Sequence, residues 1–177
     1  MVKNYSFNLV LSRAERRPRT VEVLVVLILT FLVSGVASAA PDAASAFERL
    51  KSLVGTWQVE GEDETLTYSL TGNGSALIER FRSMSSVYHM DGNDLRVTHY
   101  CGARNQPRMK AVSYRPEEGL LKFDFVDVSN LSAPDAYYTR EIEITFLSED
   151  RLRIRFNGLE KGEEQPVTLL LSRSEAR

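Results

Sequence analysis

The sequence predicts an all-β protein: an antiparallel up-and-down β-barrel of about nine or ten strands with one short N-terminal helix, preceded by a signal peptide. Three observations predict it. After residue 55 apolar side chains recur with a period of two, turn residues separate these segments at hairpin spacing, and a basic and then apolar stretch begins the chain. The 177 residues, 43% hydrophobic and 26% charged, have the composition of one globular domain, which excludes disordered, collagen-like and multi-span membrane proteins.

Residues 1–39 have the order of an export signal. Lys3 and four arginines precede an apolar run from Val23 to Val33, and small residues follow it. The run is about half as long as the ~20 residues of a membrane-spanning helix, and residues 37–39 fit an A-x-A cleavage site. We therefore expect cleavage after Ala39 and an exported protein, periplasmic or secreted, that consists of residues 40–177. The alternative is an uncleaved N-terminal anchor.

The domain that remains after cleavage is mildly acidic. Residues 1–39 hold five basic and two acidic side chains, so of 22 and 24 in the chain 17 and 22 remain, a net charge of −5. We therefore expect no interaction with nucleic acid, and none with a membrane after cleavage. Cys101 is the one cysteine, so no internal disulfide can form and the hydrophobic core must supply the stability.

One amphipathic helix of about three turns is predicted before the first strand. Asp42 and Ser45 are candidate N-caps, and Ser45 with Glu48 has capping-box spacing. Apolar residues then recur at helical intervals up to Val54, and Gly55 ends the helix.

Ten segments after Gly55 alternate between apolar and polar residues and are predicted strands. They are 56–60, 65–71, 76–82, 86–90, 95–101, 108–115, 120–128, 138–147, 151–157 and 166–173. The alternation predicts inward-facing sets: Leu66, Tyr68 and Leu70; Leu121, Phe123 and Phe125; Ile142, Ile144 and Phe146; and Leu152, Ile154 and Phe156. A barrel is preferred to a sandwich, the alternative, because closure also removes the edge strands.

The stretch from Leu50 to Trp57, a helix end followed by Gly-x-Trp, resembles the start of the first strand in calycins, the superfamily of lipocalins and fatty-acid-binding proteins. The resemblance implies a barrel end closed by Trp57, with Arg173 of the last strand packed across its ring. Such a buried pair contributes on the order of 1 to 2 kcal/mol and is structural. The stretch from Val87 to Met109 is also similar to a motif of uncharacterised exported bacterial lipocalin-like proteins, which implies the same fold.

We expect neither a cofactor nor a metal. The superfamily includes haem-binding nitrobindins, which take their axial histidine from a late strand, whereas the histidines here are His89 and His99. His99 and Cys101 are predicted to share the inward face, but these two ligands lack the third or fourth that zinc needs.

The candidate ligand-binding residues are inward-facing side chains that combine apolar surface with few polar groups. They are Tyr68, Tyr88, His99, Phe123 and Arg140. Arg140 is in phase with Ile142 and Ile144, and the resemblance to fatty-acid-binding proteins implies that an inward arginine binds a carboxylate. The alternative is a rim arginine paired with an acidic side chain in solvent.

Two orientations depend on strand register. A turn with an even number of residues pairs Met90 with Leu95 and Tyr88 with Val97, which places His89 outside, and the apolar pairs favour this turn. In segment 108–115 either of two sets faces inward: Arg108, Lys110, Val112 and Tyr114, or Met109, Ala111 and Ser113. The first set would join Arg108 to Arg140 as an anion clamp.

The function that these features predict is an exported barrel that binds a small apolar or amphipathic ligand. One alternative is an enzyme, isomerase-like or hydrolase-like, that uses His99 as an acid or base in the barrel cavity. The other is a filled barrel that serves as a partner-binding module.

Overall fold

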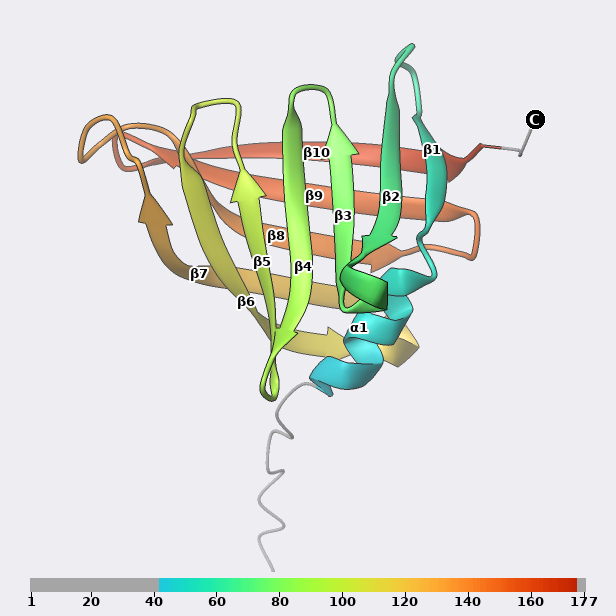
Figure 1. The fold of residues 1–177 in the computed structure, drawn as a ribbon. Helices are drawn as coiled ribbons and strands as arrows, with labels where there is room; N and C mark the ends of the chain where they lie inside the picture. The colour runs from blue at the N-terminus through green and yellow to red at the C-terminus, as the bar shows by residue number, and fades with distance from the viewer. Residues whose placement is uncertain (1–41, 175–177) are drawn as a thin grey trace, which may run out of the picture. The chain divides into compact units, whose positions relative to one another are not determined.

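A computed structural model describes residues 42–174, in which ten antiparallel strands form a closed barrel. Each strand pairs with its neighbours along the chain, and β1 closes the ring by pairing with β10 (Figure 1). The all-β up-and-down architecture with one short helix is therefore confirmed, and it is compatible with a calycin-like fold. The predicted signal peptide lies outside the described residues. Within residues 42–174 no helix is long and apolar enough to cross a membrane.

The elements follow the predicted order, and their ends differ from the predicted ends by a few residues. They are α1 (Ala43–Lys51), β1 (Gly55–Val59), β2 (Thr65–Thr71), η1 (Gly72–Gly74), β3 (Ala76–Phe81), β4 (Met84–Asp91), β5 (Asp94–Tyr100), β6 (Gln106–Arg115), η2 (Pro116–Glu118), β7 (Leu120–Ser129), β8 (Tyr138–Phe146), β9 (Arg151–Glu160) and β10 (Glu163–Arg173).

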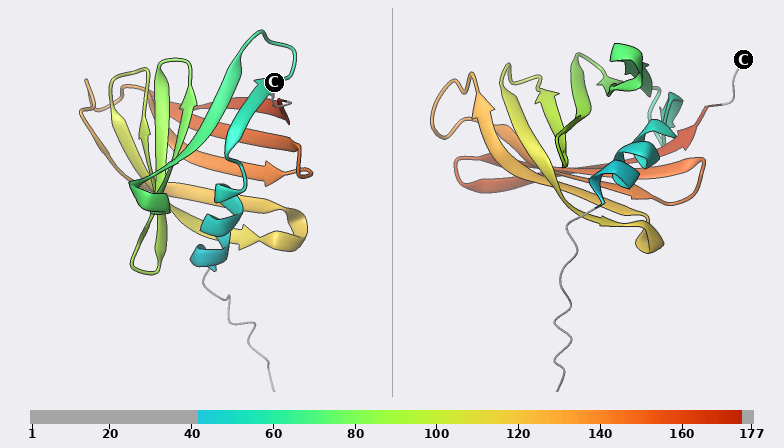
Figure 2. Two further views of the ribbon diagram at one scale, coloured as in Figure 1. Left: turned by 45° about the vertical axis from the view of Figure 1, so that its right-hand side comes forward. Right: turned by 60° about the horizontal axis from the view of Figure 1, so that its bottom comes forward.

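Helix α1 lies across one end of the barrel, which we call the closed end (Figures 1 and 2). Asp42 caps it, because its side chain accepts a hydrogen bond from the backbone N–H of Ser45. Its buried face consists of Ala43, Ala46, Phe47 and Leu50. The β2–β3 and β4–β5 turns lie at the closed end, and the β1–β2, β3–β4 and β5–β6 turns lie at the opposite, open end (Figure 1).

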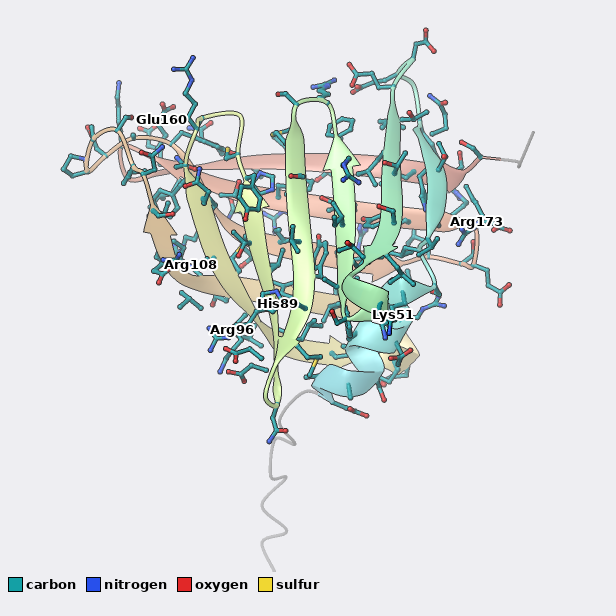
Figure 3. The ribbon with its side chains drawn as sticks, viewed as in Figure 1. Lys51, His89, Arg96, Arg108, Glu160 and Arg173 are labelled. Atoms are coloured by element: carbon teal, nitrogen blue, oxygen red, sulfur yellow. The ribbon has the colours of Figure 1, made fainter. Side chains whose placement is uncertain are left out.

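The closed end contains the contact that the calycin resemblance implies. Trp57 is fully buried and donates from Nε1 to the carbonyl oxygen of Leu53 at 2.8 Å. The guanidinium carbon of Arg173 lies 4.4 Å from the centre of the indole ring. Arg173 also donates to the carbonyl oxygens of Ser52 and Val54, so the last strand holds the loop that follows α1 (Figure 3).

Apolar side chains fill the core of the barrel. Ten of the fully buried ones are Leu66, Leu77, Leu95, Met109, Leu121, Phe123, Ile142, Ile144, Leu152 and Ile154. Leu70 was predicted inside but is 46% exposed, because it lies one residue before the end of β2 at the rim of the sheet. Apolar packing of this kind is the main source of stability in a chain without an internal disulfide.

The strand registers determine the two side-chain orientations that the sequence left undecided. Met90 pairs with Leu95 and Tyr88 with Val97, as predicted for an even turn, and His89 pairs with Arg96 on the outer face. In β6 neither set faces inward as a whole: Met109 and Ala111 are buried, and after a register shift between Ala111 and Ser113 the inward residue is Tyr114, which lies opposite Leu121.

Candidate functional site

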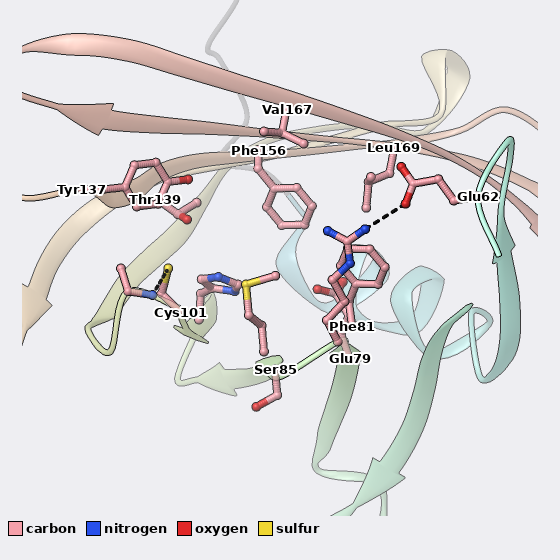
Figure 4. Close-up of a pocket in the computed structure, with 15 residues that line it drawn as sticks. Glu62, Glu79, Phe81, Ser85, Cys101, Tyr137, Thr139, Phe156, Val167 and Leu169 are labelled. Carbon is pink, nitrogen blue, oxygen red and sulfur yellow. Dashed lines mark hydrogen bonds and ion pairs between the residues drawn. The ribbon is translucent and has the colours of Figure 1, made fainter. Parts of the chain in front are cut away.

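A cavity of about 380 Å³ lies at the open end of the barrel (Figure 4). Its walls are mainly apolar and include Phe81, Met84, Phe156, Val167 and Leu169. The polar groups on its surface include Glu79, Ser85, His99, Cys101, Tyr137 and Thr139. Pockets that hold small molecules typically measure about 300 to 1,000 Å³, so the barrel has room for a small ligand.

A buried carboxylate lies at the floor of this cavity. Glu79 is 2% exposed and accepts hydrogen bonds from three hydroxyl groups. Tyr68 and Tyr88 donate to Oε2 at 2.7 and 3.0 Å, and Ser86 donates to Oε1 at 3.0 Å. None of the ion pairs within residues 42–174 includes Glu79, so its side-chain partners there are hydroxyl groups and not cations.

Strand register brings these groups together. Glu79 of β3 lies opposite Tyr68 of β2 and opposite Ser86 of β4, and Ser86 in turn lies opposite His99 of β5. Directly opposed side chains on one face of an antiparallel pair are close enough to interact. The network is therefore a row of cross-strand neighbours on the inner wall of the barrel.

His99 connects the carboxylate network to the cavity. Its Nδ1 lies 2.9 Å from the Ser86 hydroxyl oxygen, and the ring lines the cavity. Its Nε2 makes no hydrogen bond to the described part of the chain, so this nitrogen is left for a ligand. Burial lowers the pKa of His99 from 6.5 to about 4, so the imidazole is neutral at pH 7 and has one N–H and one lone pair.

Burial changes the ionisation of the neighbouring groups as well. It raises the pKa of Tyr68 and Tyr88 well above 10, so both phenols keep their protons and donate to Glu79. Burial also raises the pKa of Glu79, whereas hydrogen bonds from Tyr68, Ser86 and Tyr88 lower it. The three hydroxyl donors therefore offset part of the cost of a buried charge.

The rim of the cavity is shaped by two contacts. Arg82, in the β3–β4 turn, pairs with Glu62 and Glu64 of the β1–β2 turn at 2.9 and 2.6 Å. Tyr137 packs against Gly158, where any Cβ would overlap its ring. The open end thus has an ion-paired side and an aromatic side.

The structure separates the predicted ligand-binding residues into three groups. His99 lines the cavity as predicted. Tyr68 and Tyr88 lie behind it and bond to Glu79, and Phe123 lies deeper in the core with its ring 5.6 Å from that of Tyr88. Arg140 is outside the barrel.

The prediction that Arg140 faces inward is wrong because β8 has a bulge. Thr139 pairs with Gly158 and Glu141 with Asn157, so Arg140 has no partner and the alternation shifts by one residue. Thr139 is buried and lines the cavity, whereas Arg140 is exposed.

Arg108 does not complete an anion clamp. It is exposed on the outer face of β6 and pairs with Asp127 of β7. The two arginines that the sequence offered for a carboxylate are therefore both on the outside.

Sequence reasoning missed Glu79. The signal was the phase of the residues: Leu77, Glu79 and Phe81 lie two apart on β3, and all three are buried, whereas Ile78 is half-buried and Arg80 is exposed. A charged residue in phase with two large apolar ones indicates a buried carboxylate with hydroxyl partners.

The comparisons with known proteins add no family. No protein-family model matches the chain, and no curated protein matches it. Within the described residues no group of three or more His, Cys, Asp or Glu side chains is placed to hold a metal ion.

Proposed function

We propose that this chain is an exported calycin-like protein that binds a small, mainly apolar ligand at the open end of its barrel. One observation carries the proposal: apolar walls enclose about 380 Å³ around a single neutral imidazole that has an unpaired nitrogen. Apolar walls supply affinity and a few placed polar groups supply orientation in pockets of this type. The signal-like residues 1–39 support export.

The walls favour an amphipathic molecule over a highly charged one. Phe81, Met84 and Phe156 offer apolar contact, and His99 offers one hydrogen bond. With Arg140 and Arg108 both exposed, no arginine from the predicted set supports a carboxylate ligand.

The enzyme alternative has weaker support. A general base works best when its pKa lies near the working pH. The pKa of His99 is about 4, so its imidazole is a weak proton acceptor at neutral pH. The filled-barrel alternative does not fit the open end of the barrel, because the cavity occupies it.

Two neighbouring leucines provide a matched test. Leu169 is 7% exposed and lines the cavity, and Leu170 is 39% exposed on the outer face of the same strand. We expect N-phenyl-1-naphthylamine, a neutral apolar fluorescent probe, to bind the wild-type protein saturably. Leu169→Trp fills the cavity and abolishes the signal, whereas Leu170→Trp retains it.

Circular dichroism of both variants shows whether the barrel remains folded. A folded Leu169→Trp protein that binds the probe as tightly as the wild type contradicts the proposal, as does a wild-type protein without saturable binding. The intact mass of protein isolated from its own host tests export, since cleavage after Ala39 removes residues 1–39.

A further inference from the structure

We infer that Glu79, acting through Ser86, fixes which nitrogen of His99 carries the proton, so that the cavity selects ligands that donate a hydrogen bond. The ligand class would be alcohols or phenols, in preference to ketones, ethers and carboxylates. The ligand part of the inference rests on the proposed function. The assignment of the proton on His99 does not depend on the proposed function.

The direction of each hydrogen bond follows from the carboxylate. An ionised carboxylate only accepts, so Ser86 must give its single proton to Oε1 of Glu79. The Ser86 oxygen is then an acceptor toward Nδ1 of His99, 2.9 Å away. Nδ1 therefore carries the imidazole proton, and Nε2 presents a lone pair to the cavity.

The reverse arrangement needs a donor at position 79. If residue 79 donates to the Ser86 oxygen, the hydroxyl of Ser86 is free to donate to Nδ1, and the imidazole proton moves to Nε2. The cavity would then present an N–H. Glu79 is in this sense a positioning residue for His99, since it bonds to Ser86 and thereby changes what His99 offers.

Burial raises the pKa of Glu79, and the three hydroxyl groups around the carboxylate act in the opposite direction and stabilise its ionised form. From β2 and β4 it receives the phenol hydroxyls of Tyr68 and Tyr88, and from β4 the hydroxyl of Ser86. From β5 it faces His99 through Ser86. A carboxylate that accepts two or three hydrogen bonds is stabilised in its charged form. The same buried charge disfavours an anionic ligand nearby.

The substitution Glu79→Gln tests this without changing the side-chain shape. The amide oxygen can accept from Tyr68 and Tyr88, and the amide N–H₂ donates to Ser86. We expect the wild-type protein to hold the Nδ1–H form of His99 at neutral pH and the Glu79→Gln protein to hold the Nε2–H form. The readout is the pair of ¹⁵N chemical shifts of the ring, which distinguish a protonated nitrogen from an unprotonated one.

The chain makes this measurement simple, because it has two histidines and His89→Gln removes the other signal. A wild-type Nε2–H form overturns the inference even if Glu79→Gln fails to fold. The same form in wild type and Glu79→Gln also overturns it. Ser86→Ala removes the bridge, so adding Glu79→Gln to Ser86→Ala should leave the ring shifts unchanged. A change there overturns the role of Ser86.

Ligand competition tests the selectivity. The measurement is displacement of N-phenyl-1-naphthylamine by 1-octanol and by 2-octanone from the full chain expressed with its own N-terminal segment. We expect the wild-type protein to bind 1-octanol about tenfold more tightly than 2-octanone. The alcohol donates a hydrogen bond to Nε2 of His99, whereas the ketone leaves this acceptor without a partner. Glu79→Gln should abolish this preference, because the alcohol oxygen and the ketone oxygen can both accept from an Nε2–H. Equal affinities in the wild type overturn the selectivity but leave the proposed function standing, whereas failure of the probe itself to bind overturns the proposed function.

Discussion

A histidine inside an apolar wall stays neutral because charging it would place an unpaired cation in a region of low dielectric. His99 is 5% exposed and contacts the ring of Phe156, with 6.1 Å between the ring centres. Its one protein hydrogen bond within the described residues is to Ser86, whose hydroxyl is already directed to Glu79. The network therefore orients the imidazole without protonating it.

This burial predicts a pH-dependent stability. The pKa of His99 is 6.5 in the unfolded chain and about 4 in the folded one. Below pH 6.5 the unfolded chain takes up a proton that the folded chain does not take up until about pH 4, so stability falls as the pH falls through this window. Between pH 7 and pH 5 the loss is about 2 kcal/mol. Urea unfolding of wild type and His99→Gln at both pH values measures it.

Comparison with His99→Gln isolates the contribution of His99 to the pH dependence of stability. The raised pKa of Glu79 acts with the opposite sign, because stability from a raised pKa is lost as the pH rises, and this carboxyl is present in both proteins. The wild type should lose about 2 kcal/mol more than His99→Gln between pH 7 and pH 5. Equal losses in the two proteins would show that folding does not lower the pKa of His99.

For single residues, the sequence predicts which face of a strand a side chain occupies better than it predicts which residue that side chain contacts. Alternation was enough to place His99 inside, because its neighbours Leu95 and Val97 are apolar and in phase. Its partner Ser86 does not follow from alternation alone, but it follows when the predicted pairing of Tyr88 with Val97 is extended by two residues along each strand. Arg140 could not be placed because a bulge changes the phase without a signal in the residue types.

Hairpins fix the registers that build the site, and their tight turns require positive backbone angles. Gly92 in the β4–β5 turn has φ +59°, and Gly119 before β7 has φ +63°. The two glycines differ in their surroundings. A Cβ at Gly92 would meet nothing within 4 Å, whereas one at Gly119 would lie 2.5 Å from the carbonyl oxygen of Phe146.

Alanine substitutions at Gly92 and Gly119 distinguish the cost of backbone strain from the cost of steric overlap. We expect Gly92→Ala to cost about 1 to 2 kcal/mol, the penalty of a left-handed conformation for an L-residue. Gly119→Ala should cost at least about 2 kcal/mol more, because the backbone of β8 has to move away from the new methyl group. Chemical denaturation of the two variants measures both values. Equal costs would show that the end of β8 yields without strain.

At the scale of elements the sequence was most informative where hairpins are tight. Segment 65–71 matches β2, and the even turn between β4 and β5 was predicted from its apolar pairs. The orientation of β6 was undecidable because arginine, lysine, methionine and alanine alternate on it. The structure assigns Met109 and Ala111 to the core and pairs Arg108 with Asp127.

The interior of the barrel contains a packed core and a cavity. The closed end holds α1 and the Trp57–Arg173 contact, and the open end holds the cavity. One continuous ring of strand pairs connects the two ends, from β1 through β10. The period-two pattern predicted this ring, but the cavity depends on side-chain volumes in three dimensions and was not predictable from the pattern.

Because the ring is continuous, a ligand at the open end should stabilise the closed end. Trp57 is the one tryptophan of the chain and its ring packs against Arg173 at the closed end, so its fluorescence reports unfolding at that end. We expect 1-octanol at about 100 times its dissociation constant to raise the free energy of unfolding, followed at Trp57, by roughly 2.7 kcal/mol. Far-UV circular dichroism, which reports on all strands, should show the same shift if unfolding is two-state.

The Trp57 fluorescence and the circular dichroism can respond differently to the ligand. If circular dichroism shifts with ligand while the Trp57 transition stays in place, the open and closed ends unfold independently and the strand ring does not couple them. Coincident shifts mean that the hydrogen-bonded ring unfolds as one unit, as expected when no strand has a free edge. In that case ligand affinity at His99 and core packing around Trp57 contribute to the same unfolding equilibrium, and variants at either end change the apparent stability of both.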